Sequence, residues 1–273
     1  MGWELDFWGR NRAGVAAARS QVDASAAEHA QARLNLAAAV AAGYADLAQF
    51  FAERDTAERS VQIRQKTLAL FQERYDNGLE TQGTVSSAQS ALAAAEGELL
   101  ATGEAIALQR TRLAALLGAG PDRGLAITRP AVNLAKGYGL PKELAADLLG
   151  RRPDIVAACW MAEAQGQRID QKKAEFYPNV NLIAFIGVQS LGLDLLTRSG
   201  SGIGGIGPSF SLPIFTAGRL QGELRGTVAA YEEAIANYNR TVTQALQEVA
   251  STGQSQQALT ARLRAGWIGF VGD

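Results

Sequence analysis

The sequence predicts a mainly α-helical protein whose long helices form coiled-coil hairpins, with one β-hairpin late in the chain. Three observations support this fold class. Residues 10–118 contain no proline and consist mostly of Ala, Leu, Gln, Glu and Arg, which favour helix. Apolar residues recur there in steps of three and four. Two later segments instead alternate apolar with small or polar residues, which is the period of a strand.

Residues 1–9 are expected to be the end of a β-strand, and residues 10–118 a long helical hairpin with its tip near 76–84. The tip is indicated by DNGLETQG, where glycine can adopt the positive φ that ends a helix. At about 1.5 Å per residue, a helix from Arg10 to Asp76 would be about 100 Å long. A small globular core cannot cover such a helix, so we expect it to pack in a broad wall of helices.

Each helix of this hairpin carries one apolar seam with heptad spacing. A repeat of about 3.5 residues predicts a left-handed supercoil with neighbouring helices. Arg54 and Arg64 interrupt the first seam. The first seam consists of Leu36, Val40, Gly43, Leu47, Phe50, Arg54, Ala57, Val61, Arg64, Leu68, Phe71 and Tyr75. The second consists of Val85, Ala88, Leu92, Ala95, Leu99, Thr102, Ile106, Gln109, Leu113 and Leu116.

Residues 119–152 are expected to be an irregular segment, because proline and glycine are frequent there. A new helix is predicted over 153–177. Pro153 suits the first turn of a helix, and Asp154 interacts favourably with the helix dipole there. Arg151 and Arg152, just before this helix, could bind an anion, but we expect them to pair with carboxylates or helix termini.

Residues 178–216 are expected to form the β-hairpin, with a loop at 190–203. Each strand has about ten residues, the length that a tilted strand needs to cross a bilayer. An isolated two-stranded hairpin is marginally stable in water, so this one should join other strands in a sheet or barrel. The alternative is an edge hairpin on a water-soluble domain.

A second long helix is predicted over 217–264, and residues 265–273 form an aberrant tail that drops the heptad pattern. The seam of this helix consists of Leu224, Val228, Tyr231, Ile235, Tyr238, Val242, Ala245 and Val249.

Composition excludes several classes of function. A net charge of -1 does not favour binding to nucleic acid. The chain has one cysteine, Cys159, and one histidine, His29. It can therefore form neither an internal disulfide framework nor a metal site of several histidines. We find no catalytic constellation and no cofactor motif, so we expect neither an enzyme nor a cofactor. The charged first residues do not predict a secretory leader, and no run of about 18 apolar residues predicts a transmembrane helix.

An internal repeat links the strands to the helices. LDFWGRNRAG at 5–14 resembles LPIFTAGRLQG at 212–222: apolar residues, a glycine, an arginine and then a helix. Two such units indicate an internally duplicated protein. The strand-helix junctions are therefore Gly9, Arg10, Gly218 and Arg219.

Five stretches in order resemble the TolC-like outer-membrane factor family, in the lipoprotein branch that serves efflux pumps. They are WELDFWGR, RYDNGL, LPKELAADLLGRRPDIVAA, AEFYPNVNL and PSFSLPIFTAGRL, which together span residues 3–220. Against the family pattern, the chain is expected to be truncated at both ends. On this comparison we expect the signal peptide, the lipidated cysteine, the first helices, the first strand pair and the second helical tip to be missing.

This resemblance implies a homotrimer in the outer membrane. Three copies would contribute strands to a transmembrane β-barrel, and their helices would form a hollow cylinder in the periplasm. The alternation along 203–214 then places Phe210, Leu212 and Ile214 toward outer-membrane lipid. The implied partners are a periplasmic adaptor (membrane-fusion) protein and an inner-membrane efflux pump.

The hairpin tip would contact the adaptor. In the family, a carboxylate commonly precedes the valine of the tip, but Thr84 stands there in this chain. A plain helix-turn-helix cap explains Tyr75 and Gln82 equally well. The candidate contact residues are Arg74, Tyr75, Gly78, Leu79, Gln82, Thr84 and Val85.

The resemblance therefore implies an efflux channel that passively conducts small molecules or metal ions from the periplasm to the exterior. Two alternatives stay open on the sequence alone. The three seams would also suit a soluble periplasmic coiled-coil scaffold or adaptor, and the same family contains ducts for type I protein secretion. The hairpin distinguishes a channel from a scaffold, because only a channel requires its apolar side chains to face lipid.

Overall fold

The computed structural model describes residues 2–131, 150–188 and 202–271, apart from the side chains of 264–271. It divides into two compact units, which we call the sheet unit (1–31 with 140–273) and the hairpin unit (32–139). The first part of helix α1 (Arg10–Asp76) belongs to the sheet unit, and the remainder to the hairpin unit. Part of the predicted irregular segment, 132–149, and most of the predicted loop, 190–201, lie outside the described residues.

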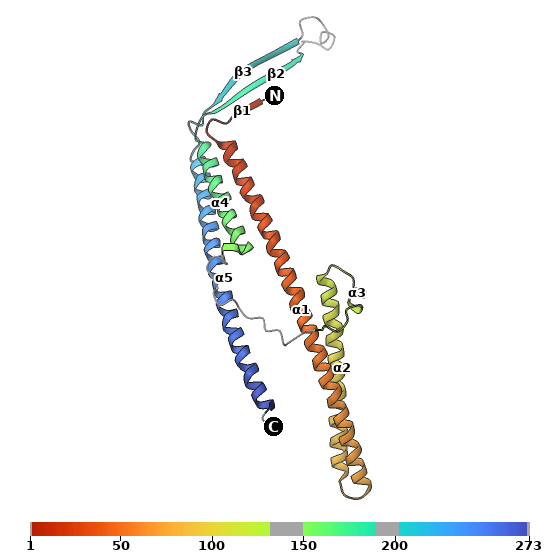
Figure 1. Cartoon of the computed structure of the whole chain (residues 1–273). Helices are drawn as coiled ribbons and strands as arrows, with labels where there is room; N and C mark the ends of the chain where they lie inside the picture. Colours follow the sequence, from red (N-terminus) through yellow and green to blue (C-terminus); the bar gives the residue numbers. More distant parts are fainter. Residues whose placement is uncertain (1, 132–149, 189–201, 272–273) are drawn as a thin grey trace. The chain divides into compact units, whose positions relative to one another are not determined.

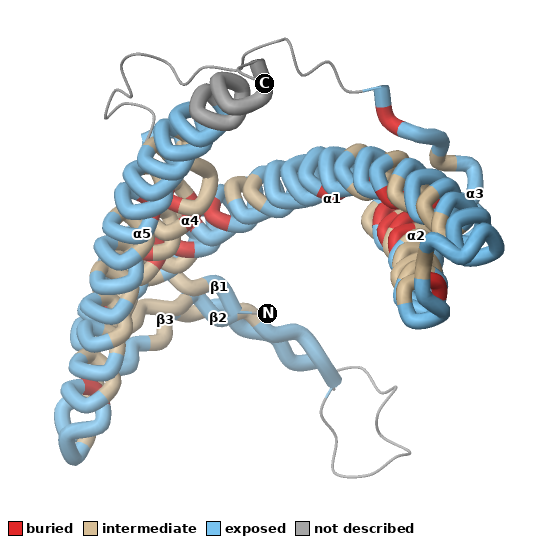
Figure 2. Tube along the Cα trace, turned by 90° about the horizontal axis from the view of Figure 1, so that it is seen from below, coloured by how far each residue is buried: buried red, intermediate tan, exposed pale blue. Residues whose placement is uncertain are grey.

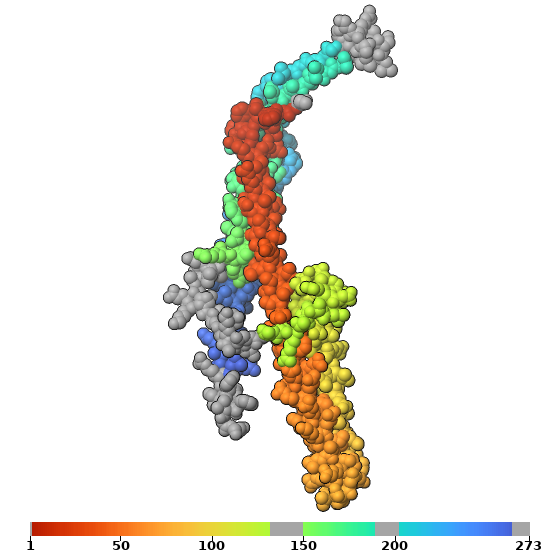
Figure 3. All heavy atoms as spheres, turned by 45° about the vertical axis from the view of Figure 1, so that its right-hand side comes forward, coloured from red at the N-terminus to blue at the C-terminus, as the bar shows by residue number. Residues whose placement is uncertain are grey.

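Three antiparallel strands form the sheet, in the order β1-β2-β3. They are β1 (Gly2–Leu5), β2 (Asn179–Val188) and β3 (Gly202–Ser211). β2 and β3 pair along their whole lengths, whereas β1 pairs only with the half of β2 nearest the helices, where Leu5 lies opposite Val180. Figure 1 and Figure 3 show β2 and β3 extending away from the helices of the sheet unit.

Beneath the sheet, α4 (Pro153–Ala174) packs along α5 (Arg219–Val271), with the start of α1 beside them (Figure 1). A methyl group added at Gly14 of α1 would lie only 3.0 Å from Gln171 Nε2, so α1 passes close to α4. Figure 2 shows in red where the buried residues lie. The buried residues of this unit are mostly small, which permits close approach of helices. They include Ala17, Ala24, Ile155, Ala157, Ala162, Ala164, Ala174, Leu220 and Ala245.

Helix α5 continues beyond the boundary expected from its apolar seam. The backbone stays helical to Val271, so most of the predicted tail 265–273 extends the helix. Loss of the heptad pattern does not end a helix, because its backbone hydrogen bonds are local. Heptad spacing is needed to pack against a neighbouring helix, but a helix can continue without such packing.

In the hairpin unit, the rest of α1 packs against α2 (Gln82–Leu116). Helix α3 (Pro121–Leu125) folds back on α2. The predicted seam of α2 is buried or half-buried at every position. The seam of α1 is less regular, since Leu36, Arg54, Arg64 and Tyr75 are exposed. The core comprises Leu47, Ile106 and Leu113, with Phe50, Phe51, Leu116 and Ile127 against it.

The segment after α3 is tied to α1 by Arg129. Its guanidinium donates two hydrogen bonds to Asp55, at 3.0 and 2.7 Å, and lies 5.5 Å from the centroid of the Phe51 ring. These bonds lower the pKa of the Asp55 carboxyl below its usual value. The side chain of Arg129 therefore fixes the end of the described segment onto α1.

One window of 18 residues in α1 has a mean hydropathy of 1.2, which by length and composition alone would suffice to cross a membrane. The sequence predicted no stretch apolar enough to cross a membrane, but this window meets the criterion of length and hydropathy. Only 17% of that window is buried, and a signal sequence or the core helix of a soluble protein can satisfy the same criterion.

Candidate functional site: a two-faced sheet and its junction with the helices

One face of the sheet is apolar along its entire described length. In an antiparallel sheet, residues directly opposite one another lie on the same face, so the strand register defines both faces. Three apolar side chains on this face are largely exposed: Ile186 at 95%, Ile206 at 74% and Phe210 at 70%. The complete face consists of Trp3, Leu5, Val180, Leu182, Ala184, Ile186, Val188, Gly202, Gly204, Ile206, Pro208 and Phe210.

The opposite face is polar where it approaches the helices. Asn181 of β2 lies opposite both Glu4 of β1 and Ser209 of β3. Asn179 and Ser211 form the next pair toward the helices. Side chains that form hydrogen bonds therefore occupy one face, and hydrocarbon occupies the other.

Two of the three side chains predicted to face lipid lie outside the strand. β3 ends at Ser211, so Leu212 and Ile214 belong to the linker before α5, and only Phe210 lies on the strand. The apolar alternation continues past the end of β3, but Pro213 has no N–H with which to extend the ladder. Leu212 and Ile214 are nevertheless exposed, at 54% and 89%.

Both predicted strand-helix junctions contain a glycine at positive φ, and in the second junction Ala217, directly before that glycine, also has a positive φ of 49°. Gly9 has φ of 78° and Gly218 has φ of 80°, and helices begin immediately afterwards at Arg10 and Arg219. Positive φ is unfavourable for residues with a side chain, so the junction requires glycine at both positions. The repeat in the sequence is therefore a repeat in structure.

The two junctions differ in how the first turn of the helix is capped. Asp6 accepts hydrogen bonds from the backbone N–H groups of Asn11 and Arg12, at 3.1 and 2.9 Å. A carboxylate there is favourable because the start of a helix has unpaired N–H groups and a partial positive charge. The equivalent position in the second junction is Phe215, three residues before Gly218, and its side chain is 89% exposed.

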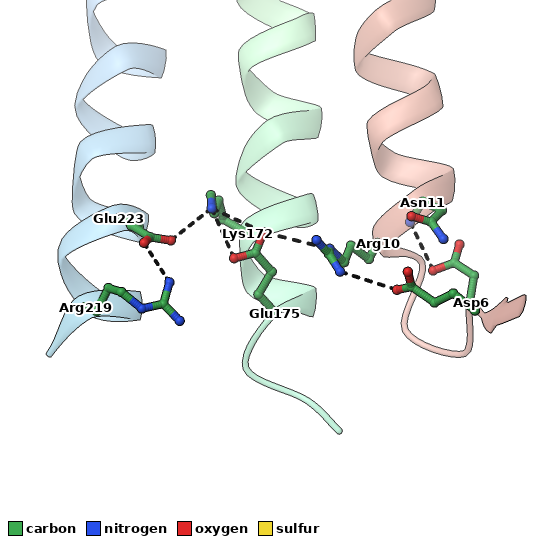
Figure 4. A network of polar contacts seen from close by, with 8 residues as sticks. Asp6, Arg10, Asn11, Lys172, Glu175, Arg219 and Glu223 are labelled. Carbon is green, nitrogen blue, oxygen red and sulfur yellow. Dashed lines mark hydrogen bonds and ion pairs between the residues drawn. The ribbon is translucent and has the colours of Figure 1, made fainter. Parts of the chain in front are cut away.

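An alternating chain of charges connects the helices at this level (Figure 4). Arg10 of α1 lies 3.9 Å from Glu175 at the end of α4, and Lys172 binds both Glu175 and Glu223 of α5 at 3.0 Å. Arg219 then pairs with Glu223 at 2.7 Å. Sequence reasoning did not identify Glu4, Lys172, Glu175 and Glu223 as members of this site.

The ion pairs in this network shift two pKa values. Hydrogen bonds from Lys172 and then Arg219 lower the pKa of Glu223, and hydrogen bonds to Glu223 and Glu175 raise the pKa of Lys172. Arg10 also reaches Glu4, at 3.4 Å, which brings β1 into the network. The network thus links β1, α1, α4 and α5.

An aromatic pair adds a second link between α1 and α4. Trp8 stacks on Tyr177 with ring centroids 4.6 Å apart, and Trp8 Nε1 donates a hydrogen bond to the carbonyl of Pro178 at 2.9 Å. Both contacts join the turn before α1 to the turn before β2. The aromatic residues in LDFWGR and AEFYP are the sequence signal for this pair.

The ion pair expected of Arg152 forms at the other end of α4. Its guanidinium lies 2.7 Å from Asp154 and 2.9 Å from Glu248 of α5. Together with the backbone N–H of Ile155, Arg152 lowers the pKa of Asp154. Carboxylates of the chain therefore occupy the positions beside Arg152 where an external anion could have bound, whereas Arg151 is exposed and has no ion pair among the described side chains.

In the hairpin unit, the predicted tip is a short turn between α1 and α2. Gly78 has φ of 73°, and Thr81 caps α2 by accepting a hydrogen bond from the N–H of Thr84 at 3.3 Å. Arg74 lies 3.8 Å from Glu80, so its charge is partly balanced within the turn. The hydroxyl groups of Thr81 and Thr84 also lie 3.1 Å apart, so the two threonines contact each other within the first turn of α2.

The tip residues differ in how far they are accessible. Leu79 is 68% exposed and Tyr75 is 38% exposed, while Val85 is only 1% exposed. Val85 therefore packs the two helices together and does not present a surface. Gln82 is exposed.

Residues 1–119 and 144–266 match the model of the outer membrane efflux protein family, and the chain belongs to this family. The resemblance to the TolC-like outer-membrane factors and the predicted fold class are thereby confirmed. Fusaric acid resistance protein FusA of Burkholderia cepacia is 42% identical over 228 residues, 82% of this chain and 43% of FusA. Multidrug resistance outer membrane protein MdtP of Escherichia coli is 33% identical over 258 residues, 94% of this chain and 53% of MdtP.

A solved structure shows the same fold. The outer membrane protein VceC of Vibrio cholerae aligns with a TM-score of 0.87 at 48% identity, covering 96% of this chain and 62% of that one. The chain thus spans about half the length of the curated relatives it matches (43% and 53%).

Proposed function

We propose that the protein is an outer-membrane channel component of a tripartite efflux system, a passive conduit from the periplasm to the exterior. The two-faced sheet that continues into long helices carries this proposal. A continuous, exposed apolar face is unfavourable in water, and its strands of ten residues have the length that a tilted strand needs in a bilayer. Membership of the efflux family and similarity to VceC support the proposal.

In this arrangement, the apolar face contacts outer-membrane lipid and the opposite face contacts water. Phe210 would lie in the lipid near the helix end of the barrel, beside Leu5 and Val180 of the neighbouring strands. Leu212 and Ile214 would follow it at the border between lipid and periplasm. A soluble scaffold has no use for such a face, which favours the channel over the scaffold.

The sheet also favours assembly of several copies, and the family resemblance leads us to propose a homotrimer. Within a bilayer every backbone N–H and C=O needs a partner, so an open sheet must close into a barrel. Within the described residues, β1 and β3 each pair on one side only, which leaves an open edge on both. Strands from sister copies would complete the barrel, and the junction network would hold each copy's helices beneath its strands.

Transport through this conduit requires no chemistry by the protein. Cargo would pass along Glu4, the two asparagines and the two serines of the polar face, which form hydrogen bonds without changing the cargo. We accordingly assign no enzymatic activity and no cofactor. Energy would come from an inner-membrane efflux pump, coupled through a periplasmic adaptor protein.

The adaptor would contact the hairpin tip through its accessible residues. Leu79 offers an apolar side chain, and Arg74 and Gln82 offer hydrogen-bond donors beside the turn at Gly78. Tyr75 and Thr84 complete the surface, and Val85 supports it from within. The names of FusA and MdtP concern resistance to fusaric acid and to several drugs, so small organic molecules are the favoured cargo, with metal ions the second class.

Reconstitution tests the proposed function directly. The protein purified in detergent should have a mass of three copies, require detergent to remain in solution, and produce stepwise ionic currents when added to planar lipid bilayers. A protein that is monomeric, stable without detergent and electrically silent in bilayers would contradict the proposal. A matched scaffold of long helices without the sheet, residues 10–118, should be silent in the same assay.

A further inference from the structure

The face of the sheet opposite the apolar one is polar over only half its length. Beyond Asn181, the residues on this face become apolar, and three of them are substantially exposed: Ile183 at 43%, Phe185 at 57% and Ile203 at 40%. The other positions of this half are glycines, namely Gly2, Gly187, Gly205 and Gly207. The outer half of the sheet is thus apolar on both faces. Contact with lipid explains the apolar residues of one face but not those of the other.

Phe185 is the largest side chain of this patch, and its ring lies over a glycine. Gly205 is directly opposite Phe185, and a Cβ at Gly205 would lie 2.9 Å from ring atom Cε1 and 3.1 Å from Cζ. Only glycine therefore leaves room for the ring in this position. Neither Gly187 nor Gly207 would bring a Cβ within 4 Å of another atom, so the surroundings of the ring are open.

We propose that Phe185, flanked by Ile183 and Ile203, is a contact site for aromatic and apolar organic solutes inside the conduit. This inference rests on the proposed function, because it requires this face to line the water-filled passage. An exposed ring there is in contact with water, and a passing apolar solute would remove part of that surface from water. The negative face of the ring also attracts organic cations, whereas small inorganic ions keep their hydration.

The position of the patch separates this site from contact with lipid. Lipid would contact the other face, which carries Ile186 and Ile206, so the patch is not needed for membrane insertion. Near the helices, the lining is built of Asn and Ser, which interact with any hydrated solute, and of Glu4, whose charge is paired with Arg10 at 3.4 Å. In the described part of this lining, Phe185 is therefore expected to distinguish aromatic and apolar organic solutes from small hydrated ones.

Block of channel current by two cations of equal charge tests the inference. The protein is reconstituted in planar bilayers in KCl, and tetraphenylphosphonium or tetramethylammonium is added. Tetraphenylphosphonium should reduce the current of the unaltered protein, and Phe185→Thr should raise the concentration needed for half block by about three- to tenfold, the effect of losing one aromatic contact. Tetramethylammonium should act alike on both proteins.

Three further variants sharpen the test. Phe185→Trp keeps an aromatic ring and should preserve the block, while Phe185→Leu should weaken it and provides a second test if the threonine variant does not assemble. Ile186→Leu, on the opposite, lipid-facing side of the same strand, should leave the block unchanged. Equal block of the unaltered protein and both Phe185→Thr and Phe185→Leu would overturn the inference while leaving the channel proposal intact. Absence of any current from the unaltered protein would overturn the proposed function and this inference with it.

Discussion

Gln109 Nε2 of α2 donates a hydrogen bond of 2.8 Å to the backbone carbonyl oxygen of Gly43 in α1. The bond is buried between the two helices, and Gln109 is only 6% exposed. A methyl group at Gly43 would lie 3.1 Å from Gln109 Nε2 and 3.0 Å from Leu113, so the glycine allows the close approach that the bond needs. A directional polar contact inside an apolar seam favours one register of the hairpin over shifted ones.

Replacing Gln109 should destabilise the hairpin unit. Gln109→Ala removes the buried hydrogen bond and leaves a cavity, which should cost about 1–3 kcal/mol. Gln89, exposed on the same helix, provides the control, since Gln89→Ala should change stability by less than about 0.5 kcal/mol. Thermal unfolding followed by circular dichroism in detergent measures both variants. Equal melting temperatures for the two would contradict a role for this bond.

Alanine should change stability in opposite directions at Gly218, a junction glycine, and at Gly222, inside α5. Gly218 has φ of 80°, so Gly218→Ala should destabilise the start of α5 by about 1–2 kcal/mol. Gly222 lies one turn into the helix, and a methyl group added there would have no other atom within 4 Å. Gly222→Ala should therefore stabilise α5 by up to about 1 kcal/mol. Melting temperatures of the two variants should move in opposite directions. A stabilising effect of alanine at Gly218 would show that the positive φ is not required.

The long helices and the register of the strands follow from local patterns. Val85, Ile106 and Leu113 recur at heptad spacing, and each is buried. Phe210 and Ser209 alternate at the period of a strand and lie on opposite faces. Spacing predicts these features because a helix or strand fixes which of its own residues share a face.

Contacts between distant segments were not predictable from the same patterns. Arg10, Lys172 and Glu223 each resemble ordinary solvated charges on a helix, and only the fold shows that they form one network. The alternation also overestimated the length of β3, because Leu212 and Ile214 continue the apolar period after strand pairing has ended at Ser211. Periodicity gives the faces of an element, whereas pairing decides where it ends.

The junction network should make stability depend on pH at both extremes. The pKa of Glu223 is lowered from an ordinary value of 4.5, so its contribution is complete above that value and is lost as the pH falls through the lower folded value. The pKa of Lys172 is raised from 10.5, so its contribution is complete below that value and is lost as the pH rises through the higher folded one. The network should therefore contribute fully between about pH 4.5 and 10.5.

Substituting Glu223 tests this window. Glu223→Gln should lower the melting temperature at pH 7, and the difference from the unaltered protein should shrink as the pH falls below 4.5. Glu232, exposed on the same helix and without an ion pair among the described side chains, is the control, and Glu232→Gln should have little effect at any pH. A difference for Glu223→Gln that stays constant from pH 7 to pH 3 would exclude the ion pairs as its cause.

The two faces of the sheet should respond differently to a charge. Ile186 is 95% exposed on the apolar face, and Ile186→Arg should disfavour insertion by about 2–4 kcal/mol near the middle of a bilayer. Ser209→Arg places the same charge on the polar face, where water can solvate it. Ser209→Arg should therefore insert normally and shift ion selectivity toward anions, because the added cation attracts them. Protection from protease in liposomes measures insertion, and the reversal potential in a KCl gradient measures selectivity. If Ile186→Arg inserts as well as Ser209→Arg, or if the anion shift appears in Ile186→Arg instead, the assignment of lipid and water to these faces is reversed or wrong.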